Sequence, residues 1–206
     1  MSIDQLYHLS CIQPSDIHEH LPTLYNYALE CNSICEFGVR NTANSTRAMV
    51  KALVDNRRNG NSGELSYIGV DLNDCGINYI QQICNQNKID YMFITGDSAK
   101  ITIPEVDLLF IDSWHVYGHL KRELEKHHSK AKKYIIMHDT ECDGEEGESI
   151  RNKWDTKKQS EETGYPEEEI RKGLRYAIEE FLEAHPEWKL KEEFKNNNGL
   201  TILNRV

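Results

Sequence analysis

The chain has 206 residues, enough to bury one substantial core without disulfides or structural metals. It contains 24 Lys and Arg residues and 34 Asp and Glu residues, and the resulting net charge of −10 argues against nucleic acid as a partner. No apolar run approaches the ~18 residues that a membrane span needs. Six cysteines without a C-x-x-C pair predict a reduced, cytoplasmic protein. We therefore expect a single domain over residues 1–206 that associates with neither nucleic acid nor membrane.

Short apolar runs alternate with helical patterns along the chain, as is typical of a parallel α/β sheet. Residues 1–32 predict an N-terminal helical segment, in which apolar residues within 14–31 have helical spacing that Pro22 interrupts. The predicted strands of the sheet are 33–37, 65–71, 89–97, 106–112 and 133–139. The later predicted helices are 46–54, 77–83, 120–131 and 170–182.

The stretch 140–165 has no hydrophobic periodicity, which predicts an insertion, a lid loop or a disordered segment. Its acidic run ECDGEEGE predicts a solvated loop, with the alternative that Glu141 or Asp143 completes a metal site. His127 and His128 are expected on a solvated helix face. Two final strands, 188–194 and 200–206, flank an Asn-Gly turn and predict a terminal β-hairpin.

Polar residues follow every predicted strand of the parallel sheet. Because parallel α/β sheets bind ligands at the carboxyl ends of their strands, these residues are expected to meet at one edge. A buried carboxylate beside other carboxylates is costly, so a repeated strand-end acid indicates a ligand site. In chain order the strand-end residues are Glu36 and Gly38, Asp71, Asp97 and Ser98, Asp112 and His115, and His138 and Asp139.

The turn EFGVRNTANST, residues 36–46, resembles the first motif of class I S-adenosylmethionine-dependent methyltransferases, usually E-x-G-x-x-x-G-x-S. Glu36, Gly38 and Ser45 match this motif, whereas residues 41–44 lack its second glycine. Asn tolerates a positive φ better than other non-Gly residues, so the turn is expected to be feasible without that glycine. The resemblance covers residues 30–206 and implies a Rossmann-like, doubly wound seven-stranded sheet, mostly parallel with a C-terminal antiparallel hairpin.

The same resemblance implies S-adenosylmethionine as the cofactor. Asp71 would accept hydrogen bonds from the ribose hydroxyls, and Asp97 with Ser98 would contact the adenine. Gly38 would let the backbone approach the cofactor closely. The complete set of expected cofactor residues is Glu36, Gly38, Arg40, Ser45, Asp71, Leu72, Asp97, Ser98, Asp112 and Trp114.

The stretches IDSWHVYGH and YIIMHDT resemble the sugar and small-molecule O-methyltransferase branch, with its macrocin and rhamnosyl O-methyltransferases and cephalosporin-hydroxylase-like proteins. The resemblance implies His115 as the general base, with Asp112 and His138 completing the catalytic set. It also implies a divalent metal on Asp112, His138 and Asp139. His138 replaces an expected acid, so three interpretations stay open: a metal softer than Mg²⁺ such as Mn²⁺, a second base, or no metal.

These features predict O-methylation of a hydroxyl group on a small molecule, a sugar or nucleotide sugar first of all, with a homodimer left open. Three alternatives compete with this prediction. A nicotinamide-dependent oxidoreductase is disfavoured because G-x-G-x-x-G is absent, and a nucleic-acid methyltransferase is disfavoured by the net charge of −10. The third alternative is a non-catalytic S-adenosylmethionine-binding protein, and a measurement of turnover would distinguish it from an enzyme.

Overall fold

The computed structural model describes all 206 residues as one seven-stranded sheet between two layers of helices. The strand order is β3-β2-β1-β4-β5-β7-β6. Strands β1 to β5 pair in parallel, and β7 pairs antiparallel with both β5 and β6. The bounds are β1 (Ser33–Phe37), β2 (Ser66–Asp71), β3 (Asp90–Thr95), β4 (Val106–Ile111), β5 (Ala131–His138), β6 (Trp188–Phe194) and β7 (Leu200–Arg205). The predicted fold class is confirmed.

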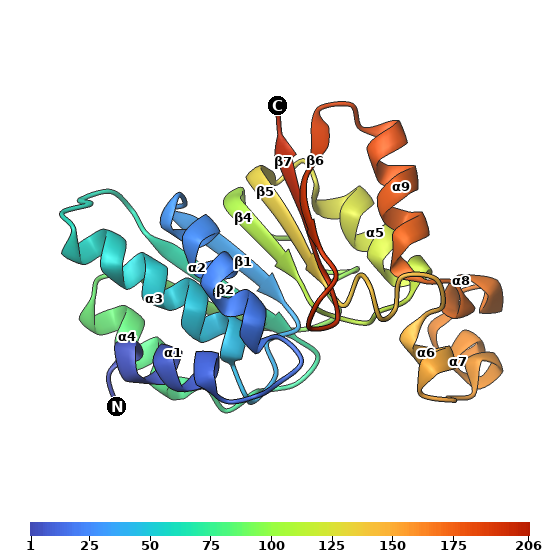
Figure 1. Cartoon of the computed structure of the whole chain (residues 1–206), viewed down its shortest axis with the longest axis horizontal. Helices are drawn as coiled ribbons and strands as arrows, with labels where there is room; N and C mark the ends of the chain where they lie inside the picture. The colour runs from blue at the N-terminus through green and yellow to red at the C-terminus, as the bar shows by residue number, and fades with distance from the viewer.

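Helices cover both faces of the sheet (Figure 1). One side carries α1 (Ile3–Ile12), the 3₁₀ turn η1 (His18–His20), α2 (Leu21–Leu29), α3 (Asn44–Arg58) and α4 (Asn78–Gln86). The other side carries α5 (Tyr117–His127) and α9 (Leu174–Ala184). Three short helices, α6 (Glu148–Arg151), α7 (Thr156–Thr163) and α8 (Glu167–Arg171), gather at one end of the molecule (Figure 1). None of the helices has the length and apolar character needed to cross a membrane.

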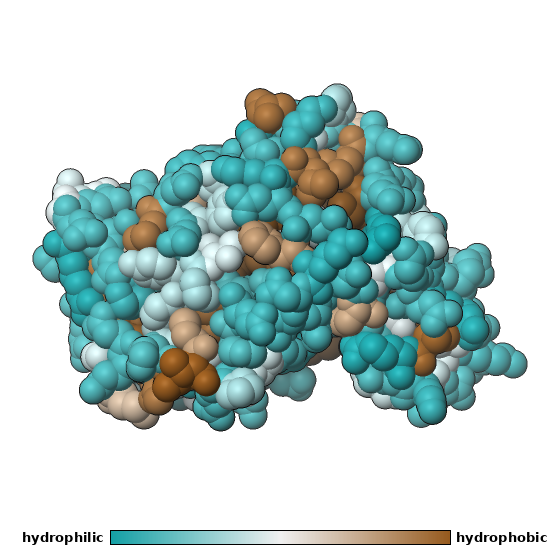
Figure 2. All heavy atoms as spheres, in the orientation of Figure 1, coloured by the Kyte–Doolittle hydropathy of each residue, from teal (hydrophilic) through white to brown (hydrophobic).

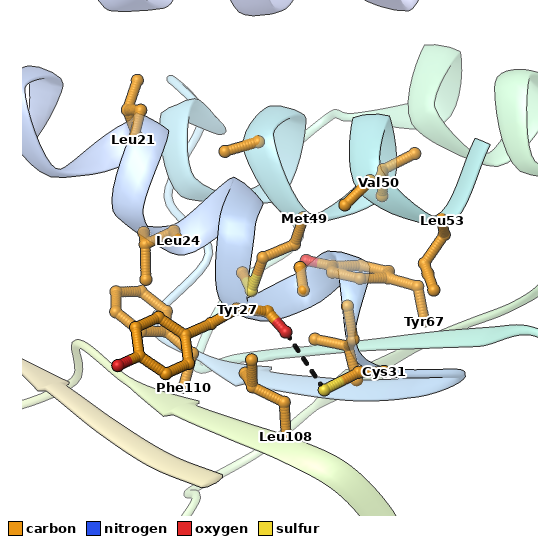
Figure 3. Close-up of a cluster of buried hydrophobic side chains, with 14 of the residues drawn as sticks. Leu21, Leu24, Tyr27, Cys31, Met49, Val50, Leu53, Tyr67, Leu108 and Phe110 are labelled. Atoms are coloured by element: carbon orange, nitrogen blue, oxygen red, sulfur yellow. Dashed lines mark hydrogen bonds between the residues drawn. The ribbon is translucent and has the colours of Figure 1, made fainter. Parts of the chain in front are cut away.

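Strand residues alternate between two apolar cores because both faces of a parallel sheet are buried. On β4, Leu108 and Phe110 belong to the core under α2 and α3, which Figure 3 shows in detail. Leu109 and Ile111 belong to the core under α5 and α9. The surface in the view of Figure 2 is mostly hydrophilic, with apolar side chains in a few separate clusters. The two cores therefore fix the sheet and leave its carboxyl edge free for polar side chains.

The N-terminal segment contains helices within the predicted bounds 1–32 and differs from its prediction at Pro22. Helix α1 begins at a capping box in which Ser2 and Gln5 bond each other's backbone N–H. Pro22 lies in the first turn of α2, where its missing N–H costs nothing, so it starts a helix and does not interrupt one.

The segment 140–165 contains regular structure, so the alternative of a disordered segment was wrong, whereas an insertion or a lid stays a prediction. It contains α6 and α7, the second of which is capped by the Asp155 carboxylate, which accepts a 3.0 Å hydrogen bond from the Lys158 N–H. Gly164 ends α7 with a φ of +75°. Helix α6 has only four residues and α7 exposes most of its residues, so no apolar periodicity reveals them in the sequence.

Candidate functional site

The turn after β1 brings the ends of β1 and β4 into direct contact. Gly38 has a φ of +85°, and a Cβ on it would lie only 1.9 Å from the Asp112 carbonyl oxygen. Glycine is therefore required here by the neighbouring strand, a constraint that the motif did not indicate. The remaining positive φ values in the turn belong to Arg40 (56°) and Ala43 (50°). The turn forms without the second glycine, as expected, although neither Asn in it has a positive φ.

A cavity of about 440 Å³ opens at the carboxyl ends of the strands, within the usual size range of ligand pockets. Eight of the ten expected cofactor residues line it: Gly38, Arg40, Asp71, Leu72, Asp97, Ser98, Asp112 and Trp114. These residues come from four different strand ends, so the sheet brings together what the sequence separates. Segment 148–165 adds Glu148, Trp154, Glu162, Thr163 and Tyr165 to the wall.

The other two expected cofactor residues, Glu36 and Ser45, lie beneath the cavity wall and do not line it. Glu36 is fully buried and accepts hydrogen bonds from the hydroxyl groups of Ser45, Thr46 (2.7 Å) and Tyr67. Burial raises the pKa of Glu36 to about 7, although the three hydroxyl donors oppose this effect. In the structure Glu36 thus connects β1, α3 and β2 beneath the turn.

Opposite charges stand at the end of the cavity near β2. The Asp71 carboxylate accepts hydrogen bonds from the backbone N–H groups of Arg40 (3.2 Å) and Asn73 (3.0 Å). The Arg40 guanidinium donates to Asp16 at 3.0 Å, and the charge of Asp112 raises its pKa. An anionic acceptor of hydroxyl hydrogen bonds and a cation therefore share this end of the cavity.

A buried polar network supports the cavity near Asp97 and Ser98. The Ser98 hydroxyl lies 3.1 Å from Nε2 of His119, and the Glu123 carboxylate lies 3.4 Å from the same nitrogen. Glu123 is fully buried and accepts a 2.7 Å hydrogen bond from the Ser113 hydroxyl. Sequence reasoning missed His119 and Glu123, whose i, i+4 spacing on α5 is the one signal that indicates the pair.

His127 also belongs to this region, and its predicted solvated position was wrong. Its Nε2 lies 2.8 Å from the Ser98 carbonyl oxygen, and its ring packs edge-on against Phe37 at 5.0 Å between centroids. Only 1% of the residue is exposed, because α5 turns this side toward the sheet.

Two aromatic rings stand over the same end of the cavity. Trp114 and Tyr165 stack with centroids 5.9 Å apart and planes at 22°. Tyr165 also carries the Arg122 guanidinium 4.0 Å above its ring centroid. Segment 148–165 therefore forms part of the cavity wall, and its opening and closing as a lid stays a prediction.

A cluster of acids and imidazoles adjoins the cavity and is called here the acid–imidazole cluster. Its members are Asp112, His115, His138, Asp139, Asp143 and Glu148. Asp112 and Glu148 also line the cavity, whereas the side chains of the expected residues His115, His138 and Asp139 lie behind its wall. The cluster is thus continuous with the cavity at Asp112.

His115 and His138 both lie close to carboxylates. Nε2 of His115 is 3.1 Å from Asp112, and its Nδ1 is 3.1 Å from Asp139 and 3.3 Å from Asp143. Nδ1 of His138 is 3.2 Å from Asp112. These charges outweigh desolvation, so the pKa of His115 is raised well above its usual value and that of His138 to about 10. The carboxylates therefore favour the protonated form of both imidazoles in this arrangement.

Asp143 is fully buried, so the expectation of a solvated acidic loop was wrong at this residue. Arg151 binds its carboxylate through two hydrogen bonds of 2.6 and 2.8 Å. Glu148 accepts the backbone N–H of His115 at 3.1 Å. These contacts anchor segment 140–165 to the cluster, whereas Glu141 remains on the surface.

The cluster has the composition of a divalent-cation site. Ligand atoms of Asp112, His138 and Asp139 all lie within 4.8 Å of one another, as do those of the set formed by the other three members. Mixed oxygen and nitrogen ligands suit Mn²⁺ better than Mg²⁺, which prefers oxygen alone. The residues therefore fit the metal that the resemblance implies.

No family model and no curated protein matches the sequence. Solved structures do share its fold. The N-methyltransferase NodS from Bradyrhizobium japonicum, in complex with S-adenosyl-L-homocysteine, has a TM-score of 0.57 at 10% identity, covering 100% of this chain and 99% of that one. An O-methyltransferase from Bacillus cereus in complex with S-adenosyl-L-homocysteine has a TM-score of 0.54 at 12% identity, covering 99% of this chain and 90% of that one.

The TDP-rhamnose 3'-O-methyltransferase CalS11, an enzyme of calicheamicin biosynthesis, has a TM-score of 0.55 at 13% identity, covering 98% of this chain and 92% of that one. At such identities the likeness concerns the arrangement of the chain, and it extends over nearly all of its length. Its seven strands, with an antiparallel β7 between β5 and β6, give this chain the fold of class I S-adenosylmethionine-dependent methyltransferases.

Proposed function

We propose that the chain is an S-adenosylmethionine-dependent O-methyltransferase that acts on a hydroxyl group of a small molecule, with a sugar or nucleotide sugar as the first candidate. The observation that supports this proposal is the position of Asp112. Its side chain belongs both to the cavity and to the acid–imidazole cluster. A methyl donor in the cavity would therefore lie beside groups that can bind and deprotonate a hydroxyl.

The cavity residues divide between the parts of the cofactor. Asp71 accepts the ribose hydroxyls, since its carboxylate retains lone pairs beyond its two backbone hydrogen bonds. Asp97 and Ser98 face the adenine beside the stacked pair formed by Trp114 and Tyr165. Arg40 supplies the positive charge for the cofactor carboxylate. S-adenosylmethionine itself supplies a methyl group already activated by its sulfonium centre.

The acceptor hydroxyl must lose a proton when it attacks, and His115 is the proposed base. The neighbouring carboxylates raise the pKa of His115 and favour its protonated form, so a base role requires that this proton leave first. A divalent cation on Asp112, His138 and Asp139 would favour the neutral imidazole and lower the pKa of the acceptor hydroxyl. Asp143, held by Arg151, keeps the His115 ring in place.

Calorimetry with S-adenosylmethionine and with NAD⁺ tests the cofactor assignment. We expect binding of the first alone, weakened about 10- to 150-fold by Asp71→Asn because a charged hydrogen-bond acceptor is lost. Asp90→Asn is the matched control, since Asp90 is exposed at the opposite end of the neighbouring strand β3. Preferential binding of NAD⁺ would favour the oxidoreductase alternative.

Turnover tests the reaction. Formation of S-adenosylhomocysteine is followed over a panel of sugars and nucleotide sugars, after chelation and after addition of Mg²⁺ or Mn²⁺. We expect the native sequence to be active and His115→Ala to be inactive. In the native sequence, we expect chelation to remove the activity and Mn²⁺ to restore it. Cofactor binding without turnover on any hydroxyl acceptor would indicate a non-catalytic binding protein. Unchanged turnover in both His115→Ala and Asp112→Asn would show that the site is assigned wrongly.

A further inference from the structure

We infer a second metal-binding site, formed by His128, His185 and Glu187, that takes a borderline divalent cation such as Zn²⁺. His128 follows the last residue of α5, His185 follows α9, and Glu187 precedes β6. Helix α5 begins at the cavity edge and runs 11 residues, about 16 Å, toward the other edge of the sheet. The site is therefore separate from the acid–imidazole cluster and does not depend on the proposed methyl transfer.

Three ligand atoms converge in this corner. The Nδ1 atoms of His128 and His185 face the same carboxylate oxygen, Oε1 of Glu187, at 3.8 and 3.5 Å. Both distances exceed those of good N–H···O hydrogen bonds, about 2.7–3.2 Å. A tetrahedral zinc ion with bonds of about 2.1 Å separates its ligand atoms by about 3.4 Å. The observed separations thus correspond more closely to an ion-binding site than to a hydrogen-bonded triad.

The His128 side chain lacks any other partner. Its Nδ1 is buried and makes no hydrogen bond in the structure. Its ring packs against the His185 ring at 4.1 Å between centroids and edge-on against Phe181 at 5.6 Å. Burying an imidazole nitrogen without a partner is costly, so these contacts leave a coordination position that an ion would satisfy.

The charges of the site also suit a divalent cation. The rings of His128 and His185 pack against each other, and a neutral imidazole is the form that binds a metal ion. Glu187 supplies the one carboxylate among the three ligands. The Arg205 guanidinium, which also lies near His128, donates a 3.3 Å hydrogen bond to the Ala131 carbonyl oxygen. Two imidazoles and one carboxylate are a common zinc ligand set that leaves a fourth position for water.

An ion in this position would join the ends of α5 and α9 to the start of β6 (Figure 1). Such an ion binds the folded chain alone, because the unfolded chain does not hold the three ligands together. The melting temperature should then rise with the logarithm of free Zn²⁺. Since α5 carries His119 and Glu123 beside the cavity, the site would also hold that helix in place.

Co²⁺ titration of tag-free protein tests the proposal, because four-coordinate Co²⁺ absorbs visible light far more strongly than six-coordinate Co²⁺. The double variant Asp112→Asn, Asp139→Asn removes two of the three ligands in one set of the acid–imidazole cluster. It should still bind one equivalent of four-coordinate Co²⁺ that Zn²⁺ displaces. Adding His185→Gln or Glu187→Gln should remove this equivalent, whereas adding His8→Ala, on the exposed face of α1, should not.

Circular dichroism and thermal melts of each variant show whether it is folded. The two conservative substitutions are at half-exposed residues, so the test does not require a change at His128, whose Nδ1 is buried. Loss of binding in both His185→Gln and Glu187→Gln, in folded protein, supports the site. Absence of any Co²⁺ in the double variant overturns the proposal. Retention of the full equivalent in His185→Gln and Glu187→Gln also overturns it.

Discussion

Replacing Glu36 by Gln should remove a pH-dependent loss of stability from this protein. Burial raises the pKa of Glu36 from 4.5 to about 7 in the folded chain, despite three hydroxyl donors. In the unfolded chain the carboxyl group ionises near its ordinary value of 4.5. Between these two pH values the folded state retains a proton that the unfolded state has released, so stability falls as pH rises.

The size of this loss follows from the difference between the two pKa values. At about 1.4 kcal/mol per pKa unit, a shift from 4.5 to about 7 costs the folded state about 3 kcal/mol once the pH exceeds 7. The amide that replaces the carboxyl group in Glu36→Gln would be neutral at every pH and would not incur this cost. The free energy of unfolding of the variant, relative to the native sequence, should therefore increase by about 3 kcal/mol between pH 4 and pH 8.

Urea unfolding at a series of pH values measures this difference directly, because all other titrating groups are common to both proteins and cancel. Glu64→Gln is the matched control, since Glu64 is solvent-exposed and its substitution removes no buried carboxyl group. Calorimetry should show nearly unchanged cofactor affinity in the Glu36 variant, because Glu36 lies beneath the cavity wall. A stability difference that does not vary with pH would refute the reasoning.

Three further predictions concern neighbouring features. Gly38→Ala should lower the free energy of unfolding by about 3 kcal/mol or more, because the added Cβ would clash with the backbone of Asp112. Gly60→Ala, at a φ of +93° but with open space around it, should lower it by only about 1–2 kcal/mol. Urea unfolding of the two variants measures the difference. Arg151→Gln leaves the buried Asp143 without its bidentate partner and should cost about 2–4 kcal/mol, which thermal melts measure and an unchanged melting temperature would contradict. Mn²⁺ affinity of the acid–imidazole cluster should rise with pH, because its protonated imidazoles must lose protons to bind metal; titration calorimetry that shows affinity falling with pH would exclude such competition.

The succession of strands along the chain and the polar residues at their ends could be predicted from the sequence, because both depend on local patterns. Apolar runs such as VDLLFID predict buried strands, and the polar residue that ends each run indicates where the strand ends. Once the strands are parallel, Asp71, Asp97 and Asp112 must meet at one edge. This reasoning needs no knowledge of long-range contacts.

The details of the site depend on contacts between distant segments, which no local pattern reports. Asp143 looks like part of a solvated acidic run until Arg151 is placed against it. His127 looks exposed until α5 is rotated onto the sheet. Ala43 has a positive φ that residue preference does not predict, and it is fully buried, so its conformation depends on tertiary packing and not on the turn sequence alone.

Asp112 is bound on three sides: its carbonyl oxygen fits against Gly38, and its carboxylate faces both the cavity and the imidazoles. A cationic sulfonium in the cavity and a divalent ion in the cluster would share the negative charge of this one residue. Their binding energies are then coupled, and each ligand should weaken the other by the same factor. Occupancy of one compartment would thus regulate release from the other, through a single carboxylate and without any movement of the backbone.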